Sequence, residues 1–113
     1  MNSQVILLLD QIEAELKALQ LWSPNPPDAA ALQSTLPFCY DTMPLQQWLQ
    51  YVLLPRMRAL VEGGLPLPGQ ISICPIAEEA FKPVDSAKLA LINRIGDLDE
   101  LLSGQRQQQS RRD

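Results

Sequence analysis

Histidine is absent from the whole chain, which removes the side chain that most often serves as a general base. Without it, Ser-His and Cys-His nucleophile pairs cannot form, and the usual transition-metal ligand is missing. The sequence also lacks a Gly-x-x-x-x-Gly-Lys-Ser/Thr loop and a Gly-x-Gly-x-x-Gly fingerprint, the glycine patterns that hold phosphate groups. We therefore predict no catalytic residue, no metal and no cofactor.

A long apolar run and a basic leader are missing as well. The run from Val5 to Leu9 stops at Asp10, far short of a signal-peptide core or a membrane span, so the cytoplasm is the expected compartment. Cysteine occurs only at Cys39 and Cys74, and because cytosolic thiols stay reduced we predict two free thiols. With 9 basic and 13 acidic residues the net charge is -4, so direct nucleic-acid binding is not expected.

Apolar residues are plentiful, at 46% of 113 residues, which is enough for one core without a metal or a disulfide framework. Their spacing predicts an all-α fold, a small antiparallel helical bundle of three main helices plus one short helix, joined by long surface loops. We expect this domain to span residues 1–104. Residues 105–113, rich in glutamine and arginine, are predicted to be a polar disordered tail.

The first predicted helix runs from about Ser3 to Leu21 and is ended by Pro24. Its apolar residues recur at spacings of three and four: Val5, Leu8, Ile12, Leu16 and Leu19. A long proline-rich connection follows, with one short helical turn expected at residues 29–33 and Phe38 as its anchor. Connections of this length in small domains are usually functional or pinned by packing.

The second predicted helix begins at Thr42, the expected N-cap, and ends at Gly63. Its apolar positions are Leu45, Trp48, Leu49, Val52, Leu53, Ala59 and Leu60. Pro55 lies inside the helix and has no backbone N–H to donate to the Tyr51 carbonyl, so we expect a kink there.

The remaining elements are an extended segment over residues 65–74, a short helix over residues 76–82, and a final helix capped by Asp85 or Ser86. The final helix carries the apolar stripe Leu91, Ile95, Leu98 and Leu102 and closes at Ser103 and Gly104. Three acids near its end, Asp97, Asp99 and Glu100, are predicted to form a solvated face.

Uncommon residue types gather in Pro37-Phe38-Cys39-Tyr40-Asp41-Thr42-Met43, at Trp48 and Tyr51, and in Leu54-Pro55-Arg56-Met57. With Leu65-Pro66-Leu67-Pro68-Gly69, this pattern resembles the YqcC-like family of small bacterial proteins, from the first helix to Leu102. The resemblance implies a small helical bundle with no established catalytic activity. The family is often labelled by association with tRNA pseudouridine synthase C, a uridine-isomerising enzyme, and the label implies a neighbour or partner more than an activity of this chain.

The synthase label can be compared with the residues themselves. Such synthases carry a catalytic aspartate in a Gly-Arg-Leu-Asp-like motif within a much larger mixed α/β domain. The nearest string here, Gly96-Asp97-Leu98-Asp99, lacks the arginine and places Leu98 on the apolar stripe of the last helix. We therefore do not expect the enzyme's activity in this chain.

The leading functional interpretation is an accessory protein or protein-interaction module with a pseudouridine synthase as its suspected partner. Its candidate binding residues are Phe38, Tyr40, Asp41, Thr42, Trp48 and Arg56, because aromatic residues and arginine dominate binding hot spots. The structural alternative is that Thr42 only caps a helix while Phe38 and Trp48 only pack in the core.

Two other functions stay open. An RNA-binding accessory protein in tRNA modification would use Arg56, Arg58 and the tail arginines, against an acidic overall charge. A small thiol enzyme would use Cys39 with Asp41, although no nearby base or cation favours the thiolate. The oligomeric state is not predicted.

Overall fold

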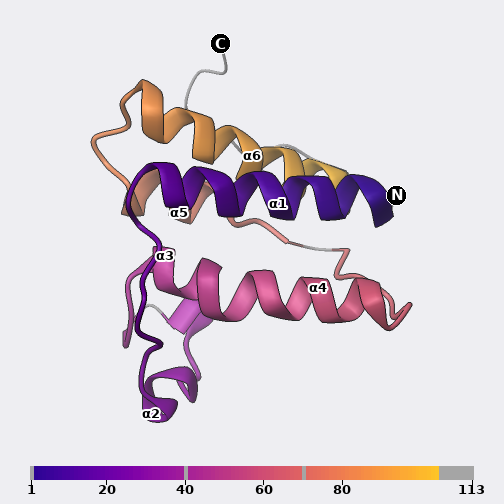
Figure 1. Ribbon diagram of the computed structural model, residues 1–113, viewed down its shortest axis with the longest axis horizontal. Coiled ribbons are helices and arrows are strands. Elements are labelled where there is room, and N and C mark those ends of the chain that lie inside the picture. The colour runs from indigo at the N-terminus through magenta and orange to yellow at the C-terminus, as the bar shows by residue number, and fades with distance from the viewer. Residues whose placement is uncertain (1, 40, 70, 105–113) are drawn as a thin grey trace.

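The computed structural model describes residues 2–39, 41–69 and 71–104, which form helices joined by long loops (Figure 1). The helices are α1 (Asn2–Ala18), α2 (Ala29–Leu32), α3 (Leu45–Trp48), α4 (Leu54–Glu62), α5 (Cys74–Ala80) and α6 (Ser86–Ser103), with a 3₁₀ turn at Pro37–Cys39 and a π-helical turn at Leu49–Leu53. No strand occurs in these ranges, which confirms the all-α prediction. The predicted tail, residues 105–113, lies outside the described residues.

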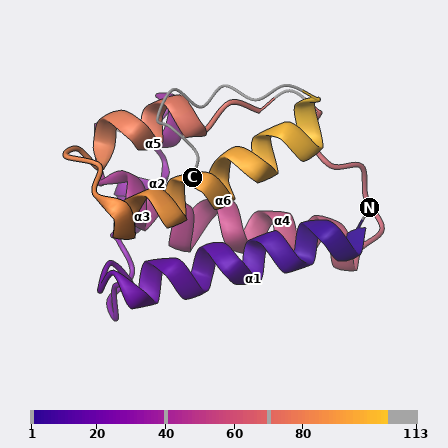
Figure 2. The ribbon, with the colours of Figure 1, turned by 90° about the horizontal axis from the view of Figure 1, so that it is seen from above.

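The three long elements pack in two layers. α1 and α6 lie side by side, and the rod formed by α3, the π-helical turn and α4 runs beneath them (Figures 1 and 2). α1 contacts both α6 and α4 and runs antiparallel to each, as predicted for the bundle. The fully buried side chains include six from the predicted stripes of the first and last helices: Val5, Ile12, Leu16, Leu91, Ile95 and Leu98. The helical periodicity of the sequence therefore identified part of the core, whereas Leu9 and Ile92 are fully buried outside the predicted stripes and Leu8 and Leu102 are only half-buried.

The second predicted helix differs from expectation in its interior and at its start. Before Pro55 the backbone forms a π-helical turn, in which the Leu54 N–H donates to the Leu49 carbonyl, so the missing proline donor is accommodated by a wider turn. At the start, the prediction that Thr42 is the N-cap is wrong, because the helix begins at Leu45. Thr42 lies in the preceding turn instead, and its N–H donates to the Cys39 carbonyl.

Asp99 also contradicts the sequence analysis, which placed it on a solvated face. Its side chain is 0% exposed and accepts the backbone N–H of Ile73, at 2.9 and 3.0 Å, and that of Cys74, at 2.7 Å. These N–H groups lie at the start of α5, where a helix has no internal acceptors for them. Asp99 thus fastens the extended segment and α5 to α6, while Glu100 is exposed as expected.

The last helix and the cysteines agree with the sequence analysis. Asp85 caps α6 by accepting the Lys88 N–H at 2.9 Å, and Gly104 ends the helix with a left-handed φ of 82°. Cys39 and Cys74 are both buried and free, which confirms the prediction of two free thiols. The short third helix begins at Cys74, two residues earlier than predicted.

Candidate interaction surface

The proline-rich connection after α1 is held to the π-helical turn by hydrogen bonds to one residue. Gln50, which is buried, accepts the Ser23 N–H at 2.7 Å and donates to the Ser23 carbonyl at 2.8 Å. The Tyr51 hydroxyl donates to the same carbonyl at 2.6 Å. The connection is therefore pinned in place, and its far half can serve as one wall of a site.

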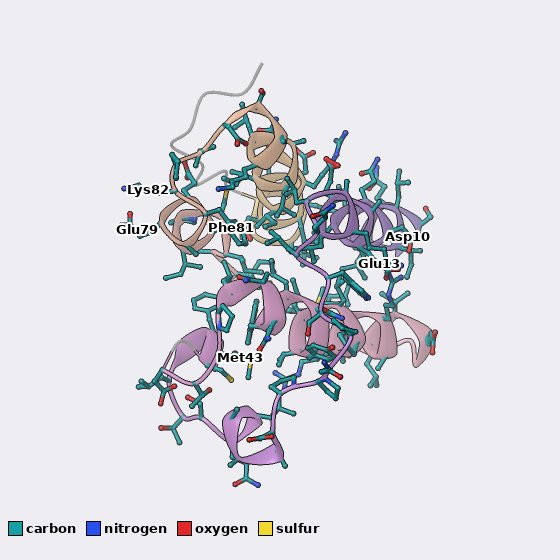
Figure 3. The ribbon with its side chains drawn as sticks, turned by 60° about the vertical axis from the view of Figure 1, so that its left-hand side comes forward. Asp10, Glu13, Met43, Glu79, Phe81 and Lys82 are labelled. Carbon is teal, nitrogen blue, oxygen red and sulfur yellow. The ribbon has the colours of Figure 1, made fainter. Side chains whose placement is uncertain are left out.

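The far half of the connection closes on itself as a lobe below the α3–α4 rod (Figure 1). Within it, the Ser34 hydroxyl donates to the Asp41 carboxylate, and the Thr42 hydroxyl lies 2.7 Å from the Ala31 carbonyl oxygen. Met43, which is 6% exposed, points into the interior of the lobe (Figure 3). Asp41 and Thr42 thus hold the lobe together.

Phe38 and Trp48 meet where the lobe joins the helical rod. Their rings are 4.9 Å apart between centroids at an interplanar angle of 78°, an edge-to-face pair. Phe38 and Cys39 have left-handed φ values of 60° and 49°, which non-glycine residues adopt at some cost and which turn the chain sharply here. Both aromatic rings are half-buried and pack against the core, yet both also face a cleft.

That cleft has a volume of about 740 Å³, and a second cavity of about 290 Å³ adjoins it. The two share a floor formed by Phe38, Trp48, Val52, Arg56 and Leu60. We call this pair of cavities the Arg56 groove. Its remaining lining side chains include Leu32, Leu36, Pro55, Ala59 and Leu65 on one side and Pro68, Ile71 and Ile73 on the other.

Large apolar side chains are exposed around the wider cleft. Leu32, Leu36 and Leu65 are 42%, 38% and 56% exposed, and they are three of the four large hydrophobic residues that are exposed in the described part of the chain. Isolated exposed leucines are ordinary, but leucines gathered around one concave surface mark an interaction site. Sequence analysis missed these leucines, although their place in proline-rich stretches without helical periodicity was a usable signal.

Arg56 supplies the charge in the groove. It is exposed, and within the described residues no acidic side chain forms an ion pair with it. Among the other polar side chains of the lining, the Tyr51 hydroxyl is bound to Ser23, the Ser34 hydroxyl donates to Asp41 and Cys39 is buried, while Ser72 is exposed. A surface of this composition suits apolar contact with one charge-assisted hydrogen bond.

The opposite side of α4 carries a closed ion-pair network. Arg58 donates to Asp10 at 2.8 Å and to Glu13 at 3.0 Å, and Lys17 donates to Glu13 at 2.9 Å. The pKa of Glu13 is lowered from 4.5, chiefly by the hydrogen bond from Lys17. Desolvation of the carboxylate raises this pKa, while the positive charges of Lys17 and Arg58 lower it further.

The structure brings together three of the six predicted binding residues, Phe38, Trp48 and Arg56, in the groove. Asp41 and Thr42 support the lobe instead of lining the groove, and Tyr40 lies outside the described residues.

In the described ranges, no group of three His, Cys, Asp or Glu side chains could hold a metal ion. The helices described are also too short or too polar to cross a membrane.

A family model, DUF446, with the description tRNA pseudouridine synthase C, matches residues 4–101 of the chain. The chain belongs to this family. It is 41% identical over 101 residues to an uncharacterised protein of Haemophilus influenzae, covering 89% of this chain and 94% of that protein. It is 34% identical over 102 residues to the uncharacterised protein YqcC of Escherichia coli, covering 90% and 94%.

A solved structure and a longer protein are also similar to this chain. The solution NMR structure of YqcC from E. coli matches with a TM-score of 0.79 and 32% identity, over 98% of this chain and 95% of that one, which confirms the fold and the predicted family. A protein of Pectobacterium carotovorum named tRNA pseudouridine synthase C is 41% identical over 81 residues. These residues make up 72% of this chain but 22% of that protein.

Proposed function

We propose that this protein is an accessory module that binds a partner protein through the Arg56 groove, and that the partner is a tRNA pseudouridine synthase. The observation that carries the proposal is the cluster of exposed leucines around a cleft with an aromatic floor. Leu36 and Leu65 present apolar surface to water there, and Phe38 with Trp48 forms a rigid base. Aromatic anchors beside an arginine are the usual composition of a binding hot spot.

The choice of partner is supported by the Pectobacterium relative. It bears the synthase name, while the segment similar to this chain makes up only 22% of its length, so the name can refer to the remaining part. A module carried on the same polypeptide as an enzyme acts beside that enzyme. We infer that this chain does the same as a separate protein, by binding.

An accessory role without catalysis is supported by the state of the candidate acids. Asp99, in the string nearest to a synthase motif, is buried and occupied by two backbone N–H groups, so a substrate could not reach it. Asp41, the proposed companion of Cys39 in a thiol enzyme, accepts a hydrogen bond from Ser34. The RNA-binding alternative has less support, because Arg58 is already engaged by Asp10 and Glu13.

The test compares two leucines of equal exposure on different surfaces. Leu65, on the groove, and Leu7, on α1, are each 56% exposed, so each can be changed to Ser with little effect on folding. In titrations with the purified tRNA pseudouridine synthase C of the same organism, Leu65→Ser should weaken binding about tenfold, and Leu7→Ser should not. Equal effects would contradict the assignment of the groove, and tight, salt-sensitive binding of tRNA by the isolated chain would favour the RNA-binding alternative.

A further inference from the structure

We infer that the segment seated in the Arg56 groove is an amphipathic α-helix of the partner, with apolar side chains on one face and a carboxylate that pairs with Arg56. The inference rests on the proposed function and specifies its chemistry. Three features of the groove carry it: its course along a helix, the absence of a strand edge in the described ranges, and the unpaired charge on its floor.

The groove follows the α3–α4 rod. Trp48, Val52, Arg56 and Leu60 recur at a spacing of four and form one continuous face of the rod. Twelve residues of helix span about 18 Å, the length of a three-turn helix laid alongside. The side-chain ridges of a helix can pack into such a face, as they do between the helices of a bundle.

An extended peptide would bind less well to this surface. Strand addition needs a sheet edge with free backbone groups, and the described ranges contain no strand. A helix satisfies its own backbone hydrogen bonds and presents only side chains to the groove. Apolar residues at i, i+3 or i+4, and i+7 would fill the two adjoining cavities, which have Trp48, Val52, Arg56 and Leu60 in common.

The charge on the floor defines what the helix must carry. A partner that covers Trp48, Val52 and Leu60 also removes water from the Arg56 guanidinium between them. A charge that is buried without a counter-charge opposes binding, so the covering face must bring an acceptor. A carboxylate matches the planar fork of an arginine with two parallel hydrogen bonds.

A second copy of the chain is the main competing occupant. An acidic apolar patch does exist on the other layer, where Leu7, Leu8 and Leu101 lie beside Asp97 and Glu100. Docking of this patch into the groove of another molecule would be a head-to-tail contact, which generates open chains of molecules unless the rotation happens to close a ring. A helix of a different protein gives a complex of defined size, and we therefore favour it.

The experiment uses Trp48 as its reporter. The chain has two tryptophans, so Trp22→Phe leaves Trp48 as the only one, and its fluorescence reports occupation of the groove during titration with purified tRNA pseudouridine synthase C. In this background Arg56→Glu should weaken binding at least tenfold. Lys82→Glu is the matched control, because Lys82 is exposed and lies outside the groove lining, and its replacement makes the same change in net charge. The affinity of this variant should stay within about twofold of the parent.

The second stage identifies the partner's segment by hydrogen exchange in the complex with the full chain. We expect protection of one helical segment, and reversal of its acidic residue to Lys should restore the affinity of the Arg56→Glu variant. A complex that depends on Leu65 but not on the charge of Arg56, or a protected segment that is not helical, would overturn the helix inference and leave the proposed function standing. Self-association that Leu7→Ser and Arg56→Glu each abolish would overturn it in favour of a second copy, and failure of the synthase to bind would reject the proposed function itself.

Discussion

Arg56 and Arg58 are separated by one residue on α4, yet their surroundings are opposite. Arg58 forms ion pairs with Asp10 and Glu13 of α1, whereas Arg56 lies among apolar side chains without an ion pair in the described residues. On the Arg58 side, the chain has already supplied an acidic helix. On the Arg56 side, exposed leucines surround a cleft that no part of the described chain fills.

The difference indicates that the two sides of α4 have different roles. The Arg58 side shows what α4 looks like when an amphipathic helix with carboxylates covers it, since α1 does that. The Arg56 side has the same ingredients, apolar side chains around an arginine, without the covering helix. We interpret the first side as structural and the second as the place where another protein completes the packing.

The largest expected effect is on the free energy of unfolding, which should fall much more when a leucine is truncated in the core than when one is truncated at the groove. Leu9→Ala, at a fully buried position of α1, should lower the free energy of unfolding by about 2–5 kcal/mol, because it leaves a cavity in the core. Leu65→Ala, at the exposed rim, should change it by less than about 0.5 kcal/mol. Urea unfolding followed by circular dichroism measures both, and similar losses for the two variants would show that the rim is part of the folded core.

A smaller effect is expected from the two arginines. Arg58→Ala removes two ion pairs. Because the side chains that form them are partly solvated, the loss should cost no more than about 1 kcal/mol of stability. Arg56→Ala should change stability by less than about 0.5 kcal/mol, since no ion pair is lost in the described residues. The difference between the variants should shrink in 1 M salt, which screens charges at the surface; an equal or larger cost for Arg56→Ala would contradict the assignment of an open side.

The smallest effect is a pH dependence confined to the Arg58 side. Because the folded-state pKa of Glu13 is lowered from 4.5, its stabilising contribution is complete above that value and is lost as the pH falls through the lowered one. Stability measured by urea unfolding between about pH 6 and about pH 3 should therefore fall slightly less in Glu13→Gln than in the parent protein. An unchanged slope in the Glu13→Gln variant would show that its ion pairs do not contribute to folding.

Local sequence rules predicted most of the fold. The apolar repeats located α1 and α6, Asp85 and Gly104 marked the two ends of α6, and the missing structural need for a disulfide predicted free thiols. The helices and their ends depend on residues within one or two turns of each other, whereas the free thiols follow from composition and redox compartment. Proline's lack of an N–H also located the disturbance at Pro55, although the π-helical form of the turn could not be read from the sequence.

The errors concern polar side chains whose partners are distant. Asp99 has the spacing of a surface acid, but the extended segment 25 residues earlier brings the Cys74 N–H to its carboxylate. Thr42 has the sequence of an N-cap, but the Ala31 carbonyl is in reach because the lobe folds back on itself. Hydrogen-bond competition of this kind depends on tertiary contacts, so no local pattern reports it.

The candidate site shows the same division. Its aromatic and arginine members, Phe38, Trp48 and Arg56, stood out by residue type, whereas Leu36 and Leu65 did not, because a leucine in the sequence is equally suited to core and surface. The sequence by itself determined the helices, their apolar faces and the acidic balance, since periodicity and charge are local or additive properties. Only the tertiary structure decided which arginine is paired, which acid is buried and which leucines remain in water, because each of these depends on which distant segment reaches that side of α4.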